Sequence, residues 1–211
     1  MEFLNYNQVD VDTINVEFPG FDPHKGIFIS GVTRDGNIIC IKKVIMKLLN
    51  LNNNELELEF LYSDNNFYKF IYSLDKCCRG QIIKNASTWF GSNANEDTIN
   101  NIYKNSINLP VKIPALPFMR FNYDEECKIM KKRKKLEISE LKSNMELEID
   151  FTITGIQYYK NKCNLCYSIQ SIKVLNDICQ SFDSLFDEDN VESNIDSETN
   201  DMTASSFKKS I

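Results

Sequence analysis

Alternating apolar and polar residues run through most of the chain and predict that it is built mainly from β-strands. In residues 145–156 (MELEIDFTITGI), apolar side chains alternate with acids and threonines. This period of two buries one face of a strand and exposes the other. Residues 55–60 (ELELEF) follow the same pattern. We expect both segments to be half-buried strands.

Turn residues between apolar runs predict two hairpins. Asp35-Gly36 separates residues 26–33 from residues 38–48, and an Asp-Gly pair favours the positive φ angles of a tight hairpin turn. In the same way, Asp64-Asn65-Asn66 separates the strand 55–60 from an aromatic run over 67–74. Further strands are expected at 111–122 and 167–175.

One segment, residues 94–107, has the spacing of an amphipathic helix. Ile99 and Ile102 fall on one helical face, an asparagine at 93 or 95 can cap the first turn, and two acids follow the cap. Pro110 ends the segment. Five or more strands around one principal helix in mid-chain favour a small Greek-key barrel over a β-sandwich.

The charge of the chain is concentrated in its last part. The net charge is −6, but residues 176–211 hold nine acids and two bases, which leaves 1–175 at +1. This excludes a generally basic nucleic-acid coat. The acidic segment lacks periodicity and is rich in Ser and Asn, so we predict one folded domain over 1–175 and a disordered acidic tail over 176–211.

Composition indicates a soluble protein of a reducing compartment. No apolar run is long enough to span a membrane, and the first residues lack the pattern of a secretion signal. The seven cysteines are irregularly spaced, unlike a disulfide framework. We therefore expect an intracellular protein that is neither secreted nor bound to a membrane.

Signatures of catalysis and of cofactor binding are lacking. The single histidine, His24, stands in a loop-like context, and neither a nucleophile elbow nor a phosphate-binding glycine loop is present. Cys163 and Cys166 have the spacing of half a zinc site, but no second pair accompanies them, so buried strand cysteines are the simpler interpretation. We expect no enzyme activity, no cofactor and no metal.

A basic segment and several aromatic pairs remain as candidate chemistry. Residues 128–135 contain six cations on a segment that we expect to link two strands. Such a segment suits a phosphate backbone, a nuclear-import signal or a solvated loop. Aromatic pairs such as Trp89-Phe90 and Tyr158-Tyr159 suit base stacking when they are exposed, and a core position when they are not.

Several short motifs, in order, resemble a known family. The stretch 85–91 (NASTWFG), followed by Leu109-Pro110, resembles the S-x-W-F segment of phage-type single-stranded DNA-binding proteins of large eukaryotic DNA viruses. Residues 136–142 (LEISELK), the strand at 145 and residues 170–174 (QSIKV) are similar to its closing elements, although 163–167 lacks the glycine and tryptophan usual there.

The resemblance implies an OB-fold-like barrel that coats single-stranded DNA without sequence preference in viral replication, recombination and repair. It also implies that the acidic tail competes with DNA or recruits replication proteins, in the host nucleus or at a cytoplasmic viral replication site. A homo-oligomer is compatible with these features. The expected tail residues are Asp183, Asp187, Glu188, Asp189 and Glu192.

The expected DNA contacts are of two kinds. Base stacking is assigned to Trp89, Phe90, Phe121 and Tyr158, with a core position as the alternative for Trp89. Phosphate contacts are assigned to Lys84, Lys112, Arg120, Lys128, Lys131, Lys132, Arg133, Lys134 and Lys135.

Two other functions stay open at this stage. One is a viral β-sandwich interaction protein, with a recruiting acidic tail and an import signal. The other is a nuclease, for which the acidic row Glu146, Glu148 and Asp150 is the ordered candidate for metal ions.

Overall fold

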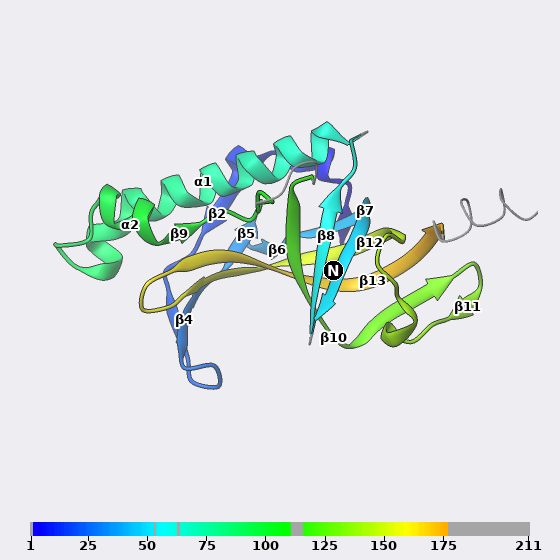
Figure 1. Ribbon diagram of the computed structural model, residues 1–211. Coiled ribbons are helices and arrows are strands. Elements are labelled where there is room, and N and C mark those ends of the chain that lie inside the picture. The colour runs from blue at the N-terminus through cyan, green and yellow to red at the C-terminus, as the bar shows by residue number, and fades with distance from the viewer. Residues whose placement is uncertain (1, 53, 63, 111–115, 177–211) are drawn as a thin grey trace, which may run out of the picture. The chain divides into compact units, whose positions relative to one another are not determined.

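The computed structural model describes residues 2–52, 54–62, 64–110 and 116–176 (Figure 1). Within these residues the fold is mixed, with mostly strands and two α-helices, α1 (Asn65–Phe90) and α2 (Glu96–Ile102). The strands are β1 (Phe3–Leu4), β2 (Ile14–Val16), β3 (Gly20–Asp22), β4 (Ile27–Ser30), β5 (Val32–Arg34), β6 (Asn37–Ile38), β7 (Cys40–Asn52), β8 (Glu55–Phe60), β9 (Tyr103–Lys104), β10 (Phe118–Lys131), β11 (Lys134–Lys135), β12 (Glu146–Tyr158) and β13 (Cys163–Asn176).

Five of these strands form a closed ring of pairings, which we call the ring. β7 pairs with β8, β8 with β10, β10 with β13, β13 with β12, and β12 again with β7. All these pairs are antiparallel except β10 with β13. Fully buried side chains from every ring strand meet in the core, among them Met46, Leu58, Phe121, Leu147 and Ile169.

The expectation of mainly strands is confirmed, but the expected small Greek-key barrel with one principal helix is only partly met. The sheet is a ring of pairings and not a barrel, and α1 is a long second helix that the pattern did not predict. The division at residue 176 stays a prediction, because residues 177–211 lie outside the described residues.

The prediction of a strand over 67–74 is wrong, because this segment lies inside α1. Asp64 caps the helix by accepting a hydrogen bond from the Phe67 backbone N–H (3.0 Å). Phe67, Ile71 and Leu74 recur at helical spacing and are buried. Figure 1 shows α1 lying along one side of the strands. Burial of this face outweighs the strand preference of its aromatic residues.

The predicted helix over 94–107 exists but is shorter. Asn95 caps it through the Thr98 backbone N–H (2.9 Å), as expected of an asparagine at this position. The helix ends at Ile102 because Tyr103 and Lys104 form β9, which pairs with the start of β13. A tertiary pairing therefore ends the helix earlier than its periodicity indicates.

The Asp35-Gly36 turn is confirmed. Both residues have positive φ angles (52° and 75°), and β5 pairs with β6 across them. The run 26–33 is divided, however, because β4 pairs with β12 while β5 pairs with β2 in a separate three-stranded sheet.

The basic segment 128–135 was expected to link two strands directly. It forms a hairpin of its own instead. β10 runs on to Lys131, Lys132 has a positive φ of 55°, and β11 pairs back with the end of β10. We call residues 128–135 the basic hairpin.

The strand predicted at 145–156 is confirmed as β12, which changes partner near Gly155. Residues 146–152 pair with β7, and Ile156, Gln157 and Tyr158 pair with β4. Gly155 has a φ of 119°, and a Cβ atom there would overlap the carbonyl oxygen of Ser30. Glycine is therefore required where the strand leaves β7 for β4.

Asp75 on α1 is a buried carboxyl group that anchors the chain after α2. It accepts hydrogen bonds from the Tyr103 hydroxyl (3.0 Å), the Ser106 backbone N–H (2.8 Å) and the Ser106 hydroxyl (2.9 Å). Ser106 Oγ also lies 2.6 Å from the Tyr167 hydroxyl on β13. Burial raises the pKa of Asp75, and the hydrogen bonds and Arg79 partly oppose the rise.

We expect Gly155→Ala to destabilise the fold by about 1–3 kcal/mol, because it combines backbone strain with a clash against Ser30. Gly80→Ala is the matched control, since Gly80 lies inside α1 with nothing near its missing Cβ atom. That change should stabilise the fold by about 0.5–1 kcal/mol. Urea unfolding measures both, and similar effects of the two changes would contradict the role given to Gly155.

Asp75 should make stability fall as pH rises. Its pKa in the folded chain lies above the ordinary value of 3.8, so between the two values the folded chain holds a proton that the unfolded chain has lost. The free energy of unfolding contributed by Asp75 is therefore present below pH 3.8 and decreases as pH rises through the folded pKa. Urea unfolding of the wild type and of Asp75→Asn from about pH 4 upward should show a stability difference that declines with pH. A constant difference would refute this.

Candidate functional site

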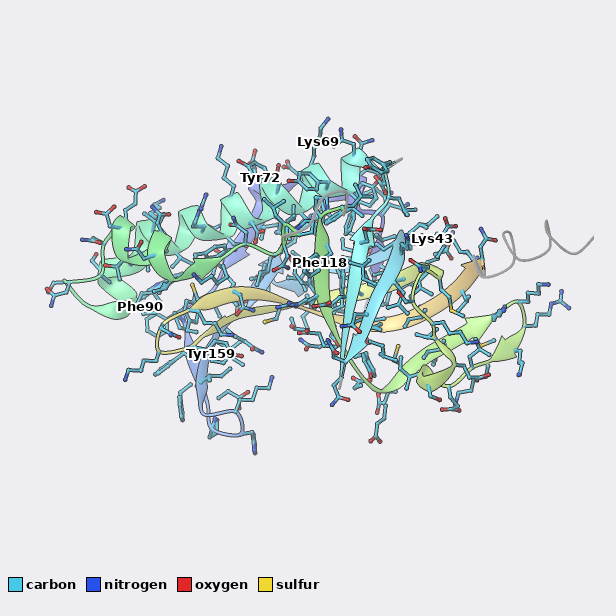
Figure 2. All side chains as sticks on the ribbon, viewed as in Figure 1. Lys43, Lys69, Tyr72, Phe90, Phe118 and Tyr159 are labelled. Carbon is cyan, nitrogen blue, oxygen red and sulfur yellow. The ribbon has the colours of Figure 1, made fainter. Side chains whose placement is uncertain are left out.

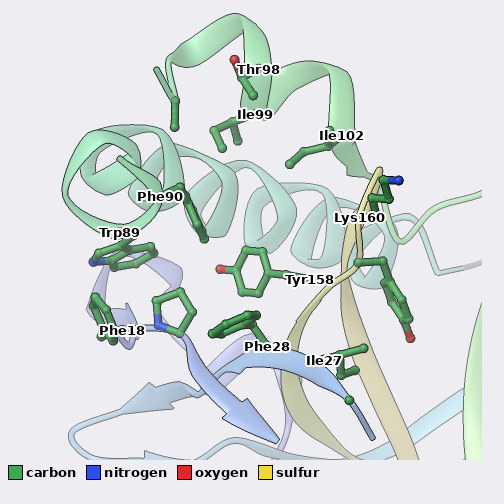
Figure 3. A pocket seen from close by; sticks show the side chains of 14 residues that line it. Phe18, Ile27, Phe28, Trp89, Phe90, Thr98, Ile99, Ile102, Tyr158 and Lys160 are labelled. Atoms are coloured by element: carbon green, nitrogen blue, oxygen red, sulfur yellow. The ribbon is translucent and has the colours of Figure 1, made fainter. Parts of the chain in front are cut away.

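A pocket of about 560 Å³ lies where α1 ends, beside α2, the loop from β12 to β13 and the β3–β4 hairpin (Figure 3). Aromatic side chains from four separate segments line it, together with Ile27, Ile99, Ile102 and Lys160. We call it the aromatic pocket. Its aromatic residues are Phe18, Phe28, Trp89, Phe90, Tyr158 and Tyr159.

The end of α1 places two neighbouring aromatic rings at the pocket. The Trp89 and Phe90 rings lie edge to face, 6.2 Å apart, and Phe18 meets Trp89 in the same manner at 6.4 Å. Gly91, with a φ of 92°, ends the helix immediately afterwards and turns the chain toward α2. Phe90 is 40% exposed and Phe18 66% exposed. These rings are therefore held in place by one another while they remain open to solvent.

Tyr158 forms the inner wall of the aromatic pocket. Its ring lies 5.3 Å from that of Phe90, and its hydroxyl lies 3.1 Å from the hydroxyl of Ser30 on β4. The residue is only 8% exposed, and burial raises its pKa, so its hydroxyl stays neutral. Figure 3 shows the Tyr158 ring between Phe90 and Phe28. This hydrogen bond ties β12 to β4 and so holds the Tyr158 side chain in position.

Several lysines lie near the aromatic pocket, at this end of the strand ring. Lys160 lines the aromatic pocket, and Lys162 Nζ lies 4.8 Å from the centre of the Tyr159 ring. Lys25, at the tip of the β3–β4 hairpin, is 3.9 Å from Asp22. Lys104 stands on β9, opposite Asn164 in the pairing with β13.

Two buried thiols, Cys163 and Cys166, lie beneath these lysines. Burial raises the pKa of Cys166 to about 11, and a backbone hydrogen bond with Gln157, then Lys25, Asn164 and Lys162, partly oppose the rise. Burial raises the pKa of Cys163 to about 12, again opposed by a lysine, Lys104. Both thiols therefore stay protonated at neutral pH.

Three of the four predicted stacking residues, Trp89, Phe90 and Tyr158, come together in the aromatic pocket. Trp89 is half-buried and contributes to both the wall and the neighbouring core. The fourth prediction, Phe121, is wrong, because this residue is fully buried inside the ring. Its side chain packs 5.1 Å from the Phe151 ring and cannot meet a ligand from solvent.

The predicted phosphate contacts are spread over distant places. Lys84 is exposed on α1, whereas Arg120 on β10 binds Glu57 at 3.0 Å and lies 3.6 Å from Glu55. Two carboxylates therefore compete with any phosphate at Arg120. The remaining cations lie on the basic hairpin, away from the pocket: Lys128, Lys131, Lys132, Arg133, Lys134 and Lys135. Lys112 and the tail residues Asp183, Asp187, Glu188, Asp189 and Glu192 lie outside the described residues.

The acidic row on β12 has other partners than a metal ion. Asp150 accepts hydrogen bonds from the Lys43 backbone N–H (2.9 Å) and the Ser171 hydroxyl (2.8 Å), and Glu148 binds Lys173 at 3.2 Å. Glu146 accepts a hydrogen bond from the Asn176 side-chain amide at 3.1 Å. In the described part of the chain, no three metal-binding side chains gather at one point.

Sequence reasoning missed the contribution of the β3–β4 hairpin to the pocket. Phe28 enters the pocket because β4 pairs with β12, which no local pattern predicts, and Phe18 reaches it from the segment just before β3. Tyr159 and Lys160 had a sequence signal, since adjacent aromatic and basic residues follow the best predicted strand. To assign Tyr159 to the site, one needs to know that Tyr158 is buried and Tyr159 is exposed.

No family model matches the chain, and no curated protein matches it. A single-stranded DNA-binding protein from bacteriophage Enc34 has a similar solved structure, with 15% identity and a TM-score of 0.44, over 86% of this chain and 96% of that one. Its structure in complex with single-stranded DNA gives 12% identity and a TM-score of 0.41, over 70% and 90% of the two chains.

A C-terminal truncation of the same bacteriophage protein gives 11% identity and a TM-score of 0.44, over 80% of this chain and 98% of that one. At such identities and scores the function of this chain has to be argued from its own residues. Among the described residues, no helix is both long and apolar enough to cross a membrane.

Proposed function

We propose that the protein binds single-stranded DNA without sequence preference, with bases stacked in the aromatic pocket. The observation that carries this proposal is the convergence of six aromatic side chains beside Lys160, with Lys162 over the Tyr159 ring. Every base offers a π-face, and stacking on an aromatic side chain contributes about 1–3 kcal/mol per base. The neighbouring lysines supply the charge that a phosphate backbone needs.

The chemistry of the pocket favours stacking over base readout. Its walls are mainly the rings and the aliphatic side chains of Ile27, Ile99 and Ile102, and the Thr98 hydroxyl is bonded to Asn95. The Tyr158 and Ser30 hydroxyls are already hydrogen-bonded to each other. Readout of base edges needs donors and acceptors at fixed places, as in groove recognition. A wall of this kind therefore accepts any unpaired base and distinguishes little among them.

The same geometry favours single strands over duplex. A base can enter a pocket between rings only when it has left the stack of a double helix, which costs a few kcal/mol. Single strands incur little of this cost. We expect the protein to act where strands are separated, as in replication, recombination and repair, and to act at viral replication sites in the host nucleus or cytoplasm.

The arrangement of the ring supports this proposal. In chain order, the five ring strands are β7, β8, β10, β12 and β13. Around the ring their order is first, second, third, fifth and fourth, and the fourth strand pairs back with the first. We infer that the ring is a variant of the OB-fold, whose loop between the fourth and fifth strands contributes to oligonucleotide binding. Here that loop carries Tyr159 and Lys160, which line the pocket. For the acidic tail we keep the proposal of competition with DNA or recruitment of replication proteins.

Loss of a pocket ring should weaken the binding of single strands. We expect Phe28→Ala and Phe90→Ala each to raise the Kd for an oligothymidylate roughly 5- to 150-fold, since each removes a stacking face. Tyr72→Ala is the matched control, because Tyr72 is also an exposed ring but lies on the outer side of α1 (Figure 2). Its Kd should stay at the wild-type value. Trp89 is the single tryptophan, so its fluorescence reports occupancy of the pocket directly.

The same titration with a duplex of equal length provides the decisive comparison. We expect quenching of Trp89 by the single strand and little response to the duplex. Equal binding of both, or identical losses for Phe90→Ala and Tyr72→Ala, would overturn the proposed function.

A further inference from the structure

The basic hairpin is a built surface and not a loose loop. Its two arms pair at Met130 with Lys135 and at Lys131 with Lys134, and the Leu136 backbone N–H donates to Ile129 O at 2.9 Å. Ile129 and Leu136 are buried, so the hairpin is anchored in the core at its base. The charged side chains of Lys128, Lys132, Arg133, Lys134 and Lys135 are exposed.

Charges around the basic hairpin leave its turn cationic. Glu140 lies 4.0 Å from Lys134 and partly offsets the charge of that lysine. Lys132 and Arg133 form the turn itself, between β10 and β11. The hairpin has no aromatic residue, so it lacks the ring faces that the pocket offers to bases. Its chemistry therefore suits mainly phosphates, and the aromatic pocket suits bases.

The basic hairpin and the aromatic pocket lie at opposite ends of β13. Cys163 pairs with Tyr158 at the pocket, and residues 171–174 pair with 128–131 at the hairpin. The eight residue steps from Cys163 to Ser171 correspond to about 26 Å along a strand. Figure 1 shows the β4 end and the β11 end of the sheet well apart. A short oligonucleotide in the pocket cannot touch the hairpin.

We propose that the basic hairpin is a second binding site, which holds phosphates of the same single strand whose bases occupy the aromatic pocket. This inference rests on the proposed function. The hairpin acts only when the strand is long enough to run from the pocket along β13. At the stacked spacing of about 3.4 Å per nucleotide, this distance corresponds to roughly eight nucleotides. Binding then has a short mode at the pocket alone and a long mode at both ends.

The test compares a hairpin variant with a control of equal charge. Lys132→Gln together with Arg133→Gln removes two exposed cations from the hairpin turn, and Lys69→Gln together with Lys76→Gln removes two from the exposed side of α1. Each is titrated with oligothymidylates of about four and about 20 nucleotides, lengths that bracket the usual site sizes of such folds. Trp89 fluorescence and a salt series give the Kd and its salt dependence.

We expect the hairpin variant to bind the long strand several-fold more weakly and to reduce its salt slope by roughly 1.4, since each phosphate contact on a single strand contributes about 0.7. Its Kd for the short strand should equal that of the wild type. The α1 control should change neither value. Thermal unfolding of each variant shows whether the fold is retained.

The other outcomes separate the two proposals. A hairpin variant with wild-type affinity and salt slope for the long strand overturns the second site, while loss of binding in Phe90→Ala still supports the pocket. Equal weakening for short and long strands contradicts two separate sites. A wild-type protein that binds neither strand overturns the proposed function itself.

Discussion

The change of partner along β12 is the constraint on which the rest of the structure depends. Its first half pairs with β7 and so closes the ring, and its last three residues pair with β4. Gly155 permits the change because the Ser30 carbonyl oxygen occupies the space of a side chain. One strand, β12, therefore contributes both to the core of the ring and to the inner wall of the aromatic pocket, so a distortion at Gly155 would affect both.

The division of chemistry between the two ends of the ring follows from the same layout. Aromatic side chains gather where β12, β4 and the end of α1 meet. Cations gather where β10 runs past the strand ring to form the basic hairpin. β13 belongs to both ends, since it pairs with β9 at its start and with the last part of β10 near its end. A rigid strand thus sets the spacing between the apolar site and the charged one.

Local patterns predicted those elements whose structure depends on near neighbours. The Asp35-Gly36 turn and β12 are such cases. A tight turn favours an Asp-Gly pair, and a half-buried strand shows alternating apolar and polar residues. α1 was missed because Phe67 and its neighbours prefer strands, and only burial against the ring favours the helix. Phe121 and Phe90 look alike in sequence, yet one is in the core and the other in the pocket. That difference depends on distant pairings, which no single segment records.

The order of the ring strands also governs when this chain can fold. Residues 40–47 of β7 find their partner only at 146–152 of β12, and β10 finds its parallel partner only in β13. Contacts this far apart in sequence make folding slow compared with that of helical proteins. During synthesis, α1 and the first strands leave the ribosome well before the segments that cover them. Part of their apolar surface stays uncovered in the meantime, and partly folded chains of this kind are prone to aggregate until β13 is complete.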